Sequence, residues 1–98
     1  MAYVYILECI DGSYYTGSTR DLDQRVWEHT IGLGARYTAR RQPVKLVYAE
    51  EYDRIDDAFA REKQLQGWSR EKKRALIEGH DARLPGLSQA RARARGPV

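Results

Sequence analysis

The first apolar run of the chain covers residues 3–10 and is rich in tyrosine, valine and isoleucine, which is typical of a β-strand. The turn residues 11–13 follow it, and the short run 14–16 then predicts the second strand of a hairpin. A third strand is expected over 44–48, directly after Pro43. Its apolar residues lie on both faces, which favours a strand in the middle of a sheet that is covered on both sides.

Helical spacing of apolar residues appears in three segments, 22–31, 56–66 and 70–78. Asp21, with Gln24 three residues later, predicts a capping box at the start of the first helix. The caps expected for the second and third helices are, respectively, Asp53 or Asp56, and Ser69. The glycines expected to end the three helices are, in order, Gly32 with Gly34, then Gly67, then Gly79.

These elements predict an α+β domain with the order β-β-α-β-α-α, in which helices pack on a small three-stranded antiparallel sheet. The polar and basic stretch 35–42 leaves open a short helix or an ordered loop. We expect the domain to cover residues 1–87. Residues 88–98 alternate alanine and arginine without an amphipathic period, which predicts a disordered basic tail.

Composition narrows the class of protein. The single cysteine, Cys9, excludes an intrachain disulfide and a zinc site built from cysteines. The apolar runs are too short to span a membrane, and no basic segment precedes the first strand, so a cytoplasmic location is expected.

The net charge of +3 equals the three arginines of the tail, so residues 1–87 sum to zero. Within them, residues 31–49 carry +4 and residues 58–79 carry +3, and together they would form a phosphate-binding rim if the fold brings them side by side.

Five side chains stand out as candidates for chemistry. Tyr5 and Tyr15 lie ten residues apart across the predicted hairpin, and Arg25 and His29 share one face of the first helix because they are four residues apart. Glu62 lies inside the second helix. A carboxylate can hold a divalent cation, and an arginine can stabilise the negative charge that develops on a phosphate. This set therefore supplies what phosphodiester hydrolysis requires.

The attacking water also needs a base, and tyrosine with its ordinary pKa of about 10 serves only if a nearby cation stabilises the phenolate. Gly17, two residues after Tyr15, lets backbone or substrate approach where a side chain would block it.

The order and spacing of these residues resemble the GIY-YIG nucleases. Residues 3–5 stand where that family has GIY, residues 15–17 stand where it has YIG, and the resemblance extends over residues 3–80. The segments 32–38 and 61–68 look like the small stand-alone bacterial, UPF0213-like subgroup. The departures are Tyr3 for the first glycine, Ser18 where some members have lysine, and His80 where the family usually has asparagine.

The resemblance implies a metal-dependent endonuclease in which Glu62 ligates Mg²⁺ or Mn²⁺ and Arg25 contacts the scissile phosphate. It also implies that Tyr5 or Tyr15 acts as general base, with Tyr5 favoured, and that His29 belongs to the catalytic set. Further contacts to DNA are expected from Gly17, Arg36, Tyr37, Arg40, Arg41, Lys63 and His80.

The expected substrate is single-stranded or branched DNA, because so small a domain has little surface with which to read a long duplex sequence. A protein partner is not indicated. The alternative is a catalytically weak or inactive nucleic-acid-binding module derived from such a nuclease.

The hairpin loop decides whether the two tyrosines can share a site. A two-residue turn would place Tyr15 opposite Glu8, on the other face from Tyr5, because strand side chains alternate. A three-residue loop would pair Cys9 with Tyr15 and place both tyrosines on one face. A shared site therefore predicts the longer loop or a bulge.

Trp27 and Trp68 are expected to anchor the core or its edge.

Overall fold

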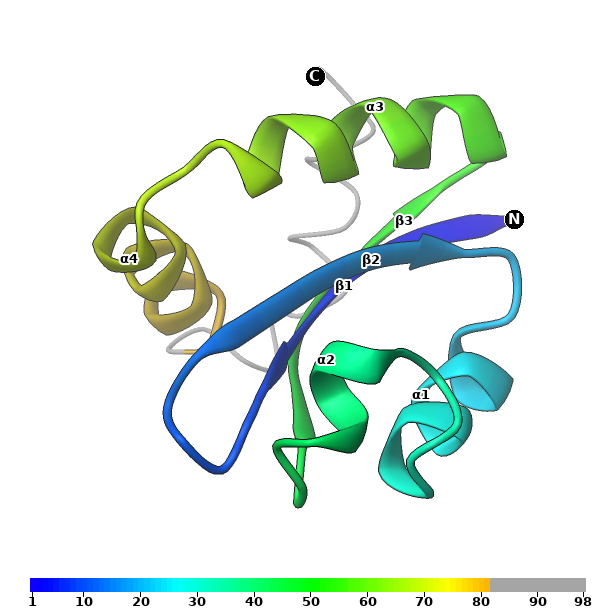
Figure 1. The fold of residues 1–98 in the computed structure, drawn as a ribbon. Coiled ribbons are helices and arrows are strands. Elements are labelled where there is room, and N and C mark those ends of the chain that lie inside the picture. Colours follow the sequence, from blue (N-terminus) through cyan, green and yellow to red (C-terminus); the bar gives the residue numbers. More distant parts are fainter. Residues whose placement is uncertain (82–98) are drawn as a thin grey trace.

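A computed structural model describes residues 1–81, with side chains described as far as residue 79. The predicted tail over 88–98 and the predicted domain end at residue 87 lie outside the described residues. The elements are β1 (Ala2–Glu8), β2 (Tyr14–Thr19), α1 (Leu22–Thr30), α2 (Arg36–Ala39), β3 (Lys45–Tyr52), α3 (Ile55–Gln66) and α4 (Arg70–Asp81) (Figure 1).

The three strands form one antiparallel sheet in the order β2-β1-β3, so the predicted α+β class is confirmed. The stretch 35–42, left open between helix and loop, contains the short helix α2. The prediction that the third strand lies in the middle of the sheet is wrong, because β3 is an edge strand and β1 is central. The burial of the two strands explains the difference: Val4, Ile6 and Leu7 of β1 are fully buried, whereas Leu46 of β3 is 41% exposed.

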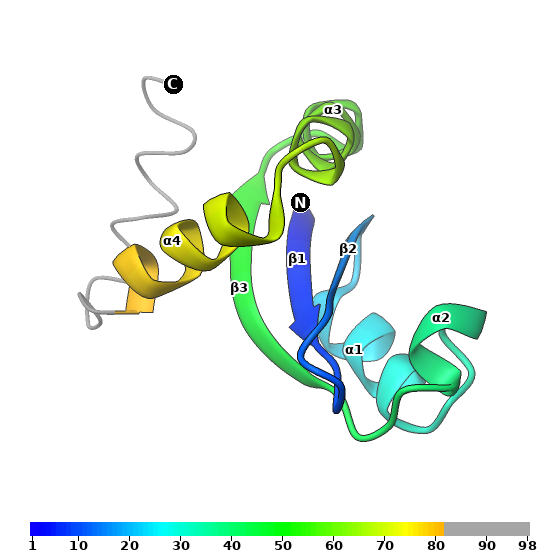
Figure 2. The ribbon, with the colours of Figure 1, turned by 60° about the vertical axis from the view of Figure 1, so that its left-hand side comes forward.

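Helices cover both faces of the sheet. α3 and α4 lie on one face, and α1 and α2 lie on the other (Figure 2). Because strand side chains alternate, Val4 and Ile6 join the core beneath α3, while Tyr5 and Leu7 join the core beneath α1. Among the described residues, no helix is long and apolar enough to cross a membrane.

The start of α1 follows the sequence pattern only in part. Asp21 is the N-cap, and its carboxylate accepts a hydrogen bond from the backbone N–H of Gln24 at 3.1 Å. The reciprocal half of the predicted capping box is wrong. The backbone N–H of Asp21 donates to the Thr19 hydroxyl instead, and the Gln24 side chain donates to Glu28. The first turn is therefore capped from strand β2 as well as from within the helix.

The ends of the later helices include two further corrections. α3 begins after Arg54 with no side-chain cap, so neither predicted aspartate is the N-cap, although Asp56 lies in the first turn, where its charge complements the helix dipole. Ser69 caps α4 as predicted, because its hydroxyl accepts from the N–H of Lys72. Gly79 does not end that helix, which continues to Asp81. Gly32, directly after the C-cap of α1, has a positive φ, whereas Gly79 has none and the helix continues through it.

The two tryptophans have different environments. Trp68 is half-buried and packs against the core beneath α3, as expected. Trp27 is 53% exposed on α1 and is not among the residues packed against either core, so its predicted place in the core or at its edge is wrong.

Candidate active site

The hairpin places the two candidate tyrosines on the same face of the sheet. Leu7 pairs with Tyr15 and Tyr5 pairs with Gly17, so Tyr5 and Tyr15 both project toward α1. The shared face is confirmed, but the expected pairing of Cys9 with Tyr15 is wrong, because the three-residue loop lies over residues 10–12, one position earlier than expected. Its ends are closed by the N–H of Cys9, which donates to the carbonyl of Ser13 at 2.9 Å.

The phenol of Tyr5 is buried against His29. Its oxygen lies 2.9 Å from Nε2 of His29, and Tyr5 is only 1% exposed. The ring crosses the backbone of β2 at Gly17, where an added Cβ would lie 2.5 Å from the phenol oxygen and 2.7 Å from Cζ. Gly17 is therefore needed at this position because Tyr5 occupies the space of a side chain, rather than because its backbone is unusual.

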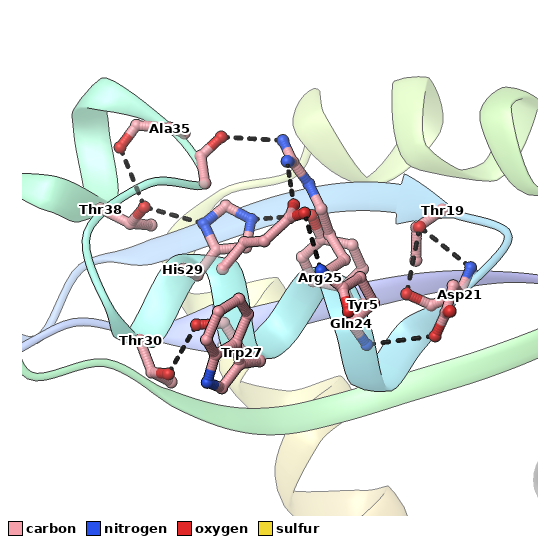
Figure 3. A network of polar contacts seen from close by, with 12 residues as sticks. Tyr5, Thr19, Asp21, Gln24, Arg25, Trp27, His29, Thr30, Ala35 and Thr38 are labelled. Carbon is pink, nitrogen blue, oxygen red and sulfur yellow. Dashed lines mark hydrogen bonds and ion pairs between the residues drawn. The ribbon is translucent and has the colours of Figure 1, made fainter.

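His29 is enclosed on the opposite side by α2 and the loop before it. Its Nδ1 lies 2.8 Å from the hydroxyl of Thr38, and that hydroxyl donates to the carbonyl of Ala35 at 3.1 Å (Figure 3). Gly34 passes over the imidazole so closely that an added Cβ would lie 2.5 Å from Nδ1. Both His29 and Thr38 are fully buried.

Burial and charge set the protonation of this pair. Burial, together with the nearby charge of Arg25, lowers the pKa of His29 to about 4, so the imidazole is neutral at neutral pH. Burial raises the pKa of Tyr5 to about 12, although a hydrogen bond with Arg25 acts in the opposite direction. The resting state is therefore a neutral phenol beside a neutral imidazole.

Arg25 lies at the edge of this buried pair. Its guanidinium donates to Glu28 at 2.9 Å and to the carbonyl of Gly34 at 2.8 Å, and its side chain remains 34% exposed (Figure 3). The acceptors hold the guanidinium in place while part of it faces solvent. This is the arrangement required of a group that meets a phosphate from outside.

A row of rings leads from the buried pair to the surface. The Tyr15 ring lies 5.0 Å from the imidazole of His29 and 6.0 Å from the ring of Tyr37. The guanidinium of Arg41 lies 3.8 Å above the Tyr37 ring and pairs with Asp11. Tyr15 is half-buried, so it is the more accessible of the two candidate tyrosines.

Glu62 reaches the site from α3, on the other side of the edge strand β2. The Ser18 hydroxyl donates to Oε1 at 2.5 Å, and the Gln66 amide donates to Oε2 at 2.8 Å. Its charge is the smallest of the contributions that raise the pKa of Tyr5, after burial and Tyr15.

The environment of Glu62 fits a divalent cation. Within residues 1–79, no lysine or arginine pairs with this carboxylate, whereas Glu28 and Glu50 pair with Arg25 and Arg61, respectively. The same part of the chain holds no cluster of three or more histidine, cysteine, aspartate or glutamate side chains suited to a metal. A metal here would thus have one protein carboxylate, with water and phosphate oxygens as its other ligands.

The remaining predicted DNA contacts lie on helices of both faces of the sheet. Arg36, Tyr37 and Arg40 are exposed on α2 or directly after it, on the same side of the sheet as Tyr5. Lys63 is exposed on α3, with its ammonium 4.7 Å from the ring of Phe59. His80 lies in the last turn of α4, and its side chain is outside the described residues.

Sequence reasoning missed three residues that complete the site. Gly34 and Thr38 enclose His29, and Ser18 orients Glu62. A hydroxyl residue nine positions after His29 carries no recognisable signal in one sequence. The glycine-rich turn 32–34 fits the end of a helix, and its sequence gives no sign that Gly34 passes over the imidazole.

Comparison with known proteins identifies the family of the chain. The model of the GIY-YIG catalytic domain matches residues 1–75. The chain therefore belongs to the GIY-YIG family, which is a nuclease superfamily, as its motifs indicate.

Relatives of the chain include small proteins of the UPF0213 group. A UPF0213 protein from Haloquadratum walsbyi is 49% identical over 84 residues, covering 85% of this chain and 94% of that protein. Another, from Staphylococcus saprophyticus, is 47% identical over 75 residues, covering 76% and 92%. The solution NMR structure of a UPF0213 protein from Bacillus halodurans matches with a TM-score of 0.52 at 44% identity, covering 80% of this chain and 84% of that one. The predicted resemblance to this subgroup is confirmed.

Proposed function

We propose that this protein is a divalent-metal-dependent endonuclease that hydrolyses phosphodiester bonds of DNA. The observation that supports this best is the buried hydrogen bond between Tyr5 and His29, which lies beside the half-exposed guanidinium of Arg25. A phenol bonded to a neutral imidazole and adjacent to a cation meets the requirement for a tyrosine that works as a base.

The proposed roles follow from these positions. Tyr5 accepts the proton of the attacking water as its own proton passes to Nε2 of His29, and Arg25 stabilises the charge that develops on the phosphate. Glu62 would hold Mg²⁺ or Mn²⁺, which supplies Lewis-acid stabilisation of the phosphate oxygens. Tyr15, half-buried and beside His29, contacts the substrate rather than serving as the base.

The proposed substrate is single-stranded or branched DNA. The ring of Tyr37, close to Tyr15 and beneath Arg41, lies where an unpaired base would meet the rim of the site. The exposed arginines Arg36 and Arg40 are suited to contacts with the phosphates of the same strand.

A cleavage assay tests this proposal. The purified protein is incubated with labelled single-stranded, duplex and branched DNA in Mg²⁺ or Mn²⁺, beside Glu62→Gln and Tyr5→Phe. We expect cleavage of the unpaired or branched substrates and its loss in both variants. Glu71→Gln, an exposed glutamate in the first turn of α4, is the matched control and should cleave like the unaltered protein. Cleavage that persists at full rate in Glu62→Gln would reject the assignment of the metal ligand.

The second candidate is a module that binds nucleic acid without cleaving it. It is favoured by one observation, namely that the proposed base Tyr5 is 1% exposed. Binding of the same DNA substrates with no cleavage in either metal would select this function.

A further inference from the structure

We propose that Thr38 is a positioning residue of this site, whose hydroxyl holds His29 in the one neutral tautomer that can accept the proton of Tyr5. The inference deepens the proposed nuclease function and rests on it. Thr38 is fully buried and cannot touch the substrate, so it acts only through His29.

Three consecutive hydrogen bonds connect the phenol of Tyr5 to the backbone carbonyl of Ala35. The phenol oxygen of Tyr5 lies 2.9 Å from Nε2 of His29, and Nδ1 of the same ring lies 2.8 Å from the hydroxyl of Thr38. That hydroxyl in turn donates to the carbonyl of Ala35 at 3.1 Å. The side chains of this series are withdrawn from water, since Tyr5 is 1% exposed and the other two are fully buried.

The direction of the series follows from its last member. A carbonyl oxygen only accepts, so the single proton of the Thr38 hydroxyl is committed to Ala35. Toward His29 the hydroxyl can only accept, which requires the imidazole proton on Nδ1. A neutral imidazole carries one proton, and Nε2 is therefore left bare, facing Tyr5. The backbone of α2 thus determines which ring nitrogen serves as the base.

The surroundings of His29 keep the ring neutral and fixed. The groups that face it are Tyr5 from β1, Tyr15 from β2, and Arg25 and Glu28 from its own helix. Burial and the charge of Arg25 keep its pKa low, so the tautomer argument applies at neutral pH.

The side chain of Gln42 links the backbone at His29 to the backbone at Thr38. The Gln42 amide donates to the carbonyl of His29 at 2.6 Å and to that of Thr38 at 2.8 Å. The end of α1 and the helix α2 are thereby joined. The hydroxyl of Thr38 is thus presented to the ring from a fixed backbone.

The tautomer of His29 determines whether Nε2 can accept the proton of Tyr5. When Tyr5 takes a proton from water, its own proton moves to Nε2 of His29, and the resulting imidazolium donates from Nδ1 to the Thr38 hydroxyl. With the opposite tautomer, Nε2 would carry a proton and could not accept another. Loss of the Thr38 hydroxyl therefore impairs the chemical step while leaving the DNA-contacting surface unchanged.

The test compares Thr38→Val, which keeps the shape but lacks the hydroxyl, with Thr38→Ser, which keeps the hydroxyl. The first readout is the ¹⁵N chemical shifts of the imidazole in the full chain, which distinguish a protonated from a bare ring nitrogen. The chain has two histidines, so a His80→Gln spectrum assigns the signals of His29. We expect Nδ1 to be protonated in the unaltered protein and in Thr38→Ser, and the proton to be redistributed to Nε2 in Thr38→Val.

The second readout is cleavage kinetics. Thr38→Val should lower kcat by about 10- to 100-fold at unchanged KM, the loss typical when the hydrogen-bond partner that orients a metal-ligating histidine is removed, and Thr38→Ser should restore it. Thr30→Val is the matched control. Thr30 makes the same kind of bond, to the carbonyl of Trp27 three residues earlier, but it is exposed and its hydroxyl is directed to that carbonyl rather than to the imidazole of His29.

Two results would overturn the inference while the proposed function stands. One is a protonated Nε2 in the unaltered protein, and the other is normal kcat in a folded Thr38→Val variant. Absence of any cleavage by the unaltered protein would overturn the proposed function and the catalytic part of this inference. The ring-nitrogen shifts decide the tautomer independently.

Discussion

The contact between Tyr5 and Gly17 makes a small substitution informative. Gly17→Ala adds one methyl group on β2, where the backbone conformation has no positive φ and so accepts any residue. The new Cβ would lie 2.5 Å from the phenol oxygen of Tyr5 and 2.7 Å from its Cζ. Any loss of stability therefore comes from the collision and not from backbone strain.

The size of the collision sets the expected loss. Non-bonded heavy atoms pack best at about 3.5 Å, so Tyr5 or strand β2 must move by about 1 Å. Overpacking of this kind typically costs about 1–3 kcal/mol, and each kcal/mol shifts the Tm of a domain of this size by about 4–8 °C. A misplacement of about 1 Å at a catalytic group can also cost about 100-fold in rate. We expect both losses, because the phenol that moves is the one bonded to His29.

Thermal and urea unfolding measure the first loss, and the cleavage assay measures the second. Gly79→Ala is the control, because Gly79 lies within α4 and an added Cβ there meets nothing within 4 Å. It should raise the free energy of unfolding by up to about 1 kcal/mol, since alanine favours the helix. Repeating Gly17→Ala in a Tyr5→Leu background should remove most of its cost. An equal cost in both backgrounds would refute the explanation.

Three other predictions concern stability and binding. Glu50 is buried and accepts hydrogen bonds from Nε and Nη2 of Arg61 and from the phenols of Tyr48 and Tyr52. Glu50→Ala should therefore lower the free energy of unfolding in urea by about 1.5–3 kcal/mol, because it removes the charged acceptor from the half-buried guanidinium of Arg61, and a loss under about 1 kcal/mol would contradict this. Because folding lowers the pKa of His29 to about 4, the unfolded chain binds a proton between pH 6.5 and 4 that the folded chain does not. Stability should accordingly fall as the pH drops through that window, and should fall less in His29→Asn. Deleting residues 88–98 removes three arginines and should reduce the slope of log K against log salt for single-stranded DNA by about 2, with kcat unchanged; an unaltered slope would mean that the tail does not contact the strand.

Local patterns determined the elements and the candidate residues. The alternation in β1 placed Tyr5 on a definite face, and the spacing of Arg25 and His29 placed both on one side of α1. The Asp21 cap was likewise predictable, because a cap bonds to a backbone group only three residues away. Such features depend on the periodicity of the backbone and on neighbours in sequence, so a single sequence contains them.

Only the tertiary structure decided how these residues become a site. Tyr5 meets His29 across 24 positions, and Ser18 meets Glu62 across 44. Gly17 is required because the ring of Tyr5 occupies the space above it, and Thr38 orients His29 because α2 folds back over α1. The fold likewise placed β3 at the edge of the sheet and left Trp27 in solvent. These outcomes depend on contacts between residues that are distant in sequence, and the periodicity of a single sequence does not specify such contacts.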